Sequence, residues 1–266
     1  MKTSATLRYL ESHEVFTLGE YLGEVDTTVS ERTRYINLQN AIDRDQAYRI
    51  KRGLYGSNLG TFRDRIPNVH LVAAKAADDA VVTHHSALEA HGVAHTPLRT
   101  VYYTSARKVG AFAVRGYLIR RVAPATLLAP KQLEHFTTRV RAGNAVVPVS
   151  TKERTLIDCL RDLDKAGGLE ELLRSLGGFT SLSVDSIAEY IGLLGSPTLA
   201  ARAGWTIELF NERWRIAADA LERLRLSLAG GTYWLIRSGA SGEARFVPRW
   251  RLYVPDGLPF EEWARG

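Results

Sequence analysis

The first sixty residues alternate between short amphipathic runs and polar turns, in an order that predicts three helices followed by a β-hairpin. A first helix is expected from about Thr6 to His13. The motif T-x-x-E at 17–20 has the form of a capping box, in which a threonine side chain and a glutamate side chain close the start of a helix. Apolar residues at helical spacing follow it: Leu18, Tyr21, Leu22 and Val25.

Ser30 can cap the third helix, which is expected to run to about Asp45. One side of this helix is predicted to pack inward through Tyr35, Leu38, Ala41 and Ile42. The opposite side carries the row Thr33, Asn37, Asn40 and Arg44, with Arg32 and Arg34 beside its start. Asparagine can bond two atoms of adenine, and arginine two of guanine, so this row fits a helix that reads bases in the major groove.

The next segment, AYRIKRGLYG at 47–56, alternates at period two and turns at Arg52-Gly53, which predicts a hairpin. We expect Arg49 and Lys51 to share one face, while Tyr48 and Ile50 close a small core on the other. Three helices and a basic hairpin, in this order, are typical of a winged helix-turn-helix, whose hairpin contacts phosphates.

The pattern of the remaining residues, 66–266, predicts a domain of mixed helices and strands. Helical patterns at 68–77 and 83–92 precede strand patterns at 101–104, 111–122 and 145–149, and helices dominate afterwards. S-T-K-E at 150–153 has the form of a second capping box. The predicted fold class is therefore α+β. Its two domains are a winged helix-turn-helix over residues 1–65 and a larger mixed α/β domain over residues 66–266.

The charge is concentrated in one segment. The 266-residue chain has a formal net charge of +6, and residues 99–150 contain nine Lys or Arg against one Glu. This basic segment is either a set of solvated strand edges or a surface that binds a polyanion. On the second interpretation, five cations would extend a DNA footprint along the phosphate backbone: Arg107, Lys108, Arg115, Arg120 and Arg121. Together with Arg32, Arg34, Arg49, Lys51 and Arg52 they would set the register on DNA.

Catalytic chemistry finds little support. Four histidines stand close together, at 84, 85, 91 and 95, but zinc needs three or four ligands held jointly, and bonds to backbone groups explain them better. The single cysteine, Cys159, is expected to be buried and inert. No phosphate-binding glycine loop is present. We expect no catalytic residues, no metal and no cofactor, with an unrecognised transferase or kinase activity of the larger domain as the alternative.

No run approaches the ~18 apolar residues of a membrane span, and the N-terminus lacks the apolar stretch of a signal peptide. A cytoplasmic protein without a membrane partner is expected.

Several longer stretches resemble the AbiEi family of antitoxins from type IV toxin–antitoxin systems. They are IKRGLYG at 50–56, AVVTHHSALEAHGVA at 80–94, VPVSTKERTLIDCL at 147–160, GGLEELLRSL at 167–176, LGSPTLAARAGWTIEL at 194–209 and WRLYVP at 250–255. The resemblance spans nearly the whole chain in the expected order. These motifs are packing and capping patterns rather than catalytic signatures.

The resemblance implies a repressor that binds inverted repeats in double-stranded DNA upstream of its own operon. It also implies an antitoxin that counteracts a neighbouring nucleotidyltransferase toxin through the C-terminal domain, without a stable complex. Two alternatives remain open at this point: an interaction protein that binds the toxin directly, and an enzyme that inactivates the toxin by covalent modification.

Overall fold

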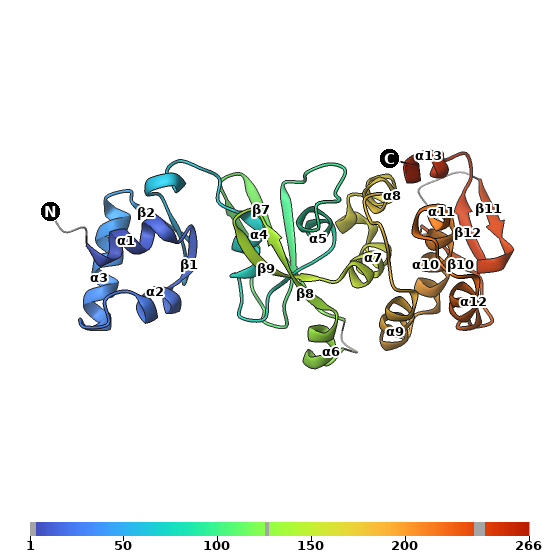
Figure 1. Cartoon of the computed structure of the whole chain (residues 1–266), viewed down its shortest axis with the longest axis horizontal. Coiled ribbons are helices and arrows are strands. Elements are labelled where there is room, and N and C mark those ends of the chain that lie inside the picture. The colour runs from blue at the N-terminus through green and yellow to red at the C-terminus, as the bar shows by residue number, and fades with distance from the viewer. Residues whose placement is uncertain (1–3, 126–127, 237–242, 266) are drawn as a thin grey trace. The chain divides into compact units, whose positions relative to one another are not determined.

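The structure of the chain is a computed structural model that describes residues 4–125, 128–236 and 243–265. Its N-terminal part is a winged helix (Figure 1). The elements follow one another as α1 (Ala5–Ser12), β1 (Val15–Thr17), α2 (Leu18–Glu24), α3 (Glu31–Asp43), β2 (Ala47–Lys51) and β3 (Leu54–Ser57). Strands β2 and β3 form the antiparallel hairpin, and β1 pairs with β3 to complete a three-stranded sheet. The predicted order of helices and hairpin is confirmed.

Two polar caps fix where these helices begin. The capping box at Thr17 and Glu20 is present in both directions, and the Ser30 side chain accepts from the Thr33 backbone N–H. The core enclosed by the winged helix is rich in aromatic rings. Its buried members are Tyr9, Leu10, Phe16, Tyr21, Val25, Leu38, Ala41, Ala47 and Tyr55.

A six-stranded mixed sheet follows, in the order β6-β7-β5-β4-β9-β8. Its strands are β4 (Val81–Val82), β5 (Thr100–Thr104), β6 (Phe112–Val114), β7 (Tyr117–Val122), β8 (Thr137–Ala142) and β9 (Ala145–Ser150). The single strand expected at 111–122 is wrong. Arg115 and Gly116 both adopt positive φ, at 45° and 85°, so the segment turns back as a hairpin of β6 and β7. Two short elements, η1 (Gly60–Phe62) and α4 (Val69–Ala74), precede β4 in the chain. Between the strands stand α5 (His85–Ala90), after β4, and α6 (Pro130–His135), after β7.

Helices dominate the C-terminal part, as expected. They are α7 (Lys152–Arg161), η2 (Leu163–Ala166), α8 (Leu169–Leu176), α9 (Val184–Leu194), α10 (Pro197–Leu209), α11 (Asn211–Trp214), α12 (Ala218–Leu226) and α13 (Phe260–Arg265). A second three-stranded sheet, ordered β10-β12-β11, packs with them; its strands are β10 (Tyr233–Trp234), β11 (Ala244–Val247) and β12 (Leu252–Pro255), with η3 (Pro248–Trp250) between the last two. The cap of α7 is Thr151, which accepts from Arg154, and not Ser150 as predicted, because the Ser150 hydroxyl bonds Thr155 instead.

The chain divides into two compact units, which we describe separately. Unit 1 contains residues 1–82, 99–122 and 141–147, and unit 2 contains residues 83–98, 123–140 and 148–266. The predicted domain border at 65/66 therefore does not separate the two units. The reason is local: Glu14 accepts from the Asn68 backbone at 2.9 Å and Glu20 pairs with Lys75, so the winged helix is joined to the first elements that follow it.

Across the described residues, we find no helix whose length and apolar character would let it cross a membrane.

Candidate nucleic-acid interface

The exposed face of α3 carries the row of polar side chains that the sequence predicts. Thr33, Asn37, Asn40 and Arg44 are all exposed, and so is Arg32 at the start of the helix. Arg44 caps the C-terminal end of α3, where a cation interacts favourably with the helix dipole. An exposed helix face that carries amide and guanidinium groups has the chemistry needed for contacts with base edges.

The buried face of α3 matches the prediction at Leu38 and Ala41, and Ile42 is partly buried against the same core. It differs at one place, because Arg34 is buried whereas Tyr35 is 42% exposed. Arg34 was expected to contact phosphates, and this expectation is wrong. Its side chain is 7% exposed and a guanidinium nitrogen donates to the Asp26 carbonyl at 3.4 Å, while Tyr21 donates to the Arg34 backbone oxygen.

Ile36 lies at the surface of α3, next to the polar row, and its apolar side chain was not predicted there. Ile36 is 47% exposed, and helical spacing sets it beside Arg32 and Asn40. An exposed aliphatic side chain in a row of polar ones can contact the methyl group of thymine. The signal in the sequence was its spacing: residues 32, 36 and 40 repeat every four positions.

The hairpin presents fewer cations than expected. Arg49 and Arg52 are exposed, but the pairing of β2 with β3 shifts register between Arg49 and Lys51, so these two residues do not share a face. Lys51 lies 5.8 Å from the ring centre of Phe112, and burial lowers its pKa although Asp78 acts in the opposite sense. Lys51 is thus partly withdrawn from solvent.

Tyr48 was predicted to close the core of the winged helix, and it does not. Its ring lies against Gly56, where an added Cβ would come within 2.4 Å of the ring, and the Arg115 guanidinium lies 5.0 Å from the ring centre. A cation over an aromatic face is attracted to it. Tyr48 therefore joins the hairpin to the β6–β7 turn, and glycine at position 56 leaves room for this contact.

The remaining predicted cations of the basic segment differ in availability. Lys108, Arg115 and Arg120 are exposed. Arg107 is exposed too, but lies 3.2 Å from the Asp78 carboxylate. Arg120 and Arg121 are neighbours on β7 and point to opposite faces, because side chains alternate along a strand. Arg121 donates to the Ser105 carbonyl at 2.6 Å and is only partly exposed, so the structure does not favour a phosphate contact for it.

The four clustered histidines have separate environments in unit 2. His85 is buried, with Nε2 3.0 Å from Glu171 and Nδ1 3.4 Å from Glu89. Burial lowers the pKa of His85, but these two carboxylates outweigh it and raise the pKa above its usual value. His91 bonds the Ser150 carbonyl at 2.9 Å, as the predicted backbone role requires. In the part of the chain that the structure describes, no three His, Cys, Asp or Glu side chains are placed to hold a metal ion.

His84 has an uncommon backbone. Its φ of 53° and ψ of −137° lie at the turn between β4 and α5, a conformation that favours glycine. Burial lowers its pKa to about 4, although Asp158 acts in the opposite sense, so the imidazole is neutral at neutral pH.

A buried polar network centred on Asp158 was not predicted. Its carboxylate accepts from Thr83 at 3.1 Å, Arg154 at 3.1 Å and Tyr190 at 2.8 Å. These donors come from three separate parts of unit 2, so the network fixes α7 in its surroundings. Cys159, the next residue, is fully buried and burial raises the pKa of its thiol, which confirms the interpretation of an inert cysteine.

The comparisons with known proteins give information about the fold and not about the function. No protein-family model and no curated protein matches the chain. Among solved structures, the chain is similar to the crystal structure of the RV2827C protein from Mycobacterium tuberculosis, with a TM-score of 0.61 and 12% sequence identity, over 94% of this chain and 90% of that one. At this identity the likeness concerns architecture alone. The chain is an α+β protein with an N-terminal winged helix.

Proposed function

We propose that this protein is a DNA-binding antitoxin of the AbiEi type that represses its own operon. In this proposal α3 enters the major groove, and Asn37, Asn40 and Arg44 contact base edges, with Thr33 against a methyl group or a phosphate. The observation that supports it most directly is the continuous exposed row on α3, beside exposed Arg49 and Arg52 on the adjoining hairpin. Such a protein works in the cytoplasm, where its operator is.

Fewer residues are proposed to contact phosphates than the sequence suggests. We retain Arg32, Arg49 and Arg52 in the winged helix, and Arg107, Lys108, Arg115 and Arg120 beyond it. Arg34 and Arg121 are left out because their guanidinium groups are engaged within the fold. Lys51 contributes less than a fully solvated lysine, since burial disfavours its charged form.

A binding titration tests the base contacts. Asn40→Ala should lose ~1–3 kcal/mol of affinity for DNA from upstream of the operon, because a bidentate contact to one base is removed. Its affinity for a scrambled duplex of the same length should stay unchanged. Arg49→Ala should weaken binding to both duplexes alike, and Lys131→Ala, which removes one exposed charge outside the proposed footprint, serves as its control. Equal losses of Asn40→Ala on both duplexes would exclude the reading role of α3.

The antitoxin half of the proposal derives from the resemblance stated above and has its own test. Co-expression of this chain with the nucleotidyltransferase encoded beside it should restore growth. A variant with Asn40→Ala should restore growth equally well when both genes are driven by a foreign promoter, because neutralisation is assigned to the C-terminal part and not to α3. Failure of rescue by the intact chain would remove the antitoxin assignment and leave the DNA-binding one standing.

A further inference from the structure

The C-terminal sheet of unit 2 has two edge strands among the described residues, and β11 is the longer of them. Within the described residues the order is β10-β12-β11, so β11 is an edge. The Asp256 N–H donates to the Glu243 carbonyl at 2.9 Å, which shows that position 243 directs its backbone toward β12. Backbone groups alternate along an antiparallel strand, so the N–H and C=O groups of Ala244 and Phe246 point to the open side.

An aromatic ladder crosses the outer face of this sheet and stops at that edge. Trp234 and Phe246 both stand opposite Tyr253, with ring centres 4.6 and 5.0 Å from it. Trp234 is 40% exposed and Phe246 is 43% exposed. Exposed aromatic residues beside open backbone groups invite pairing with another strand, and monomeric proteins normally protect such edges.

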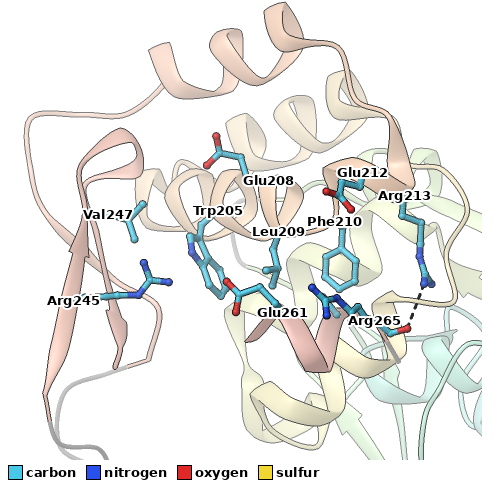
Figure 2. A pocket seen from close by; sticks show the side chains of 11 residues that line it. Trp205, Glu208, Leu209, Phe210, Glu212, Arg213, Arg245, Val247, Glu261 and Arg265 are labelled. Atoms are coloured by element: carbon cyan, nitrogen blue, oxygen red, sulfur yellow. Dashed lines mark hydrogen bonds between the residues drawn. The ribbon is translucent and has the colours of Figure 1, made fainter. Parts of the chain in front are cut away.

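The opposite face of β11, which carries Arg245 and Val247, lines a pocket. Arg245 and Val247 line a cavity of about 470 Å³ together with Trp205 and Phe210, as Figure 2 shows. The side chains of β11 thus alternate between the aromatic ladder and this pocket. A strand added along β11 would alternate in the same way, since it continues the same sheet.

The strand β11 is complementary to a second copy of itself. An antiparallel copy centred on Phe246 would set the outward N–H and C=O groups of Phe246 against those of its counterpart and would continue the ladder from ring to ring. Arg245 would then lie opposite Val247 of the other copy. A register centred on Arg245 would instead place two guanidinium groups directly opposite each other, which destabilises a strand pair. Ala244 would lie opposite Pro248, which has no N–H to donate to the Ala244 carbonyl, so the backbone pairing is limited to the positions around Phe246.

We propose that two copies of this chain associate through their β11 strands, antiparallel, about a two-fold axis at Phe246. A two-fold axis on the protein matches the symmetry of an inverted repeat in DNA. The use of the dimer, though not its existence, therefore rests on the proposed function. Because β11 has four residues, we expect a modest interface and a dimer that dissociates on dilution.

Sedimentation equilibrium of the full chain over a range of concentrations tests the association. The intact protein should pass from monomer to dimer, and Phe246→Lys should raise the dissociation constant by roughly tenfold or more, since it removes the aromatic contact and sets two charges together. Leu226→Lys is the matched control, because Leu226 is an exposed apolar residue (69%) on α12, and it should leave the dissociation constant unchanged.

A cross-linking experiment tests the register separately. Phe246→Cys should be joined to its own counterpart by a short bis-maleimide, whereas Leu226→Cys should not; the natural Cys159 is buried and stays unreactive. A monomer at every concentration, or equal cross-linking of the two variants, would overturn the proposal. On DNA, Phe246→Lys should lose cooperativity between the two half-sites and keep its affinity for a single half-site. If the intact protein does not bind a single half-site at all, that result counts against the proposed function and not against the dimer.

Discussion

At the scale of single residues, the environment decides what each charged group contributes. Arg32 and Arg34 are two positions apart on α3, yet one is exposed and the other is 7% exposed beneath the helix. His84 and His85 are adjacent, yet burial lowers the pKa of the first to about 4 and two carboxylates raise that of the second. Residue type alone does not distinguish the members of either pair.

His85 gives a pH-dependent prediction. A histidine whose pKa is raised by folding stabilises the folded state fully below its unfolded pKa, about 6.5, and this contribution is lost as the pH rises through the raised value. The stability lost in His85→Gln should therefore be largest below the unfolded pKa of about 6.5 and shrink as the pH rises through the raised pKa of the folded state. Unfolding by urea across this range measures it, and comparing the two proteins at each pH cancels the opposite effect of His84. A loss that grows with pH would contradict the assigned ion pairs.

At the scale of elements, periodicity sets which side chains can act together. The hairpin strand β2 keeps its alternation only up to Arg49, because the register shift moves Lys51 toward Phe112. Strand β7 is regular, so Arg120 and Arg121 point to opposite faces, and only Arg121 bonds the Ser105 carbonyl. Two adjacent arginines are thus expected to differ in function.

This difference on β7 can be measured by salt dependence. Arg120→Ala should reduce the slope of log affinity against log salt by about 1, because one phosphate contact and its released counterion are lost. Arg121→Ala should leave the slope unchanged and lower the melting temperature instead, since it removes an internal hydrogen bond. If Arg121→Ala alters the slope and Arg120→Ala does not, the face of the sheet turned toward DNA is the other one.

At the scale of the whole molecule, the positive charge and the polar row of α3 lie in different segments, and the charged segment is divided between the two units. The charge excess belongs to residues 99–150, while the polar row belongs to α3. We expect affinity for matched and scrambled duplexes to fall in parallel as salt rises, because the ionic contribution is the same on any sequence. Their ratio should change little, since base contacts release few counterions. Fluorescence anisotropy at several salt concentrations measures both quantities, and a ratio that collapses with salt would assign specificity to phosphate contacts.

The sequence by itself determined the three helices and the hairpin of the N-terminal part and where α2 and α3 start, although it missed strands such as β1 and β8. Local signals are sufficient for this: the capping box at Thr17 and the Ser30 cap use residues within three positions, and the hairpin turn at Arg52-Gly53 needs only a glycine with φ of 79°. The exposed row Thr33, Asn37, Asn40 and Arg44 was also predictable, because helical spacing alone places these residues on one side.

Only the tertiary structure decided which side chains are covered. The buried face of α3 includes Arg34, whose guanidinium reaches the Asp26 carbonyl, whereas Tyr35, which was predicted to pack inward, is exposed. Likewise, the place of the Tyr48 ring is set by Gly56 and Arg115. The buried carboxylate of Asp158 is satisfied by hydrogen bonds from Thr83 and Tyr190. These partners lie between 8 and 75 positions away in the chain, whereas a local pattern reports only on near neighbours.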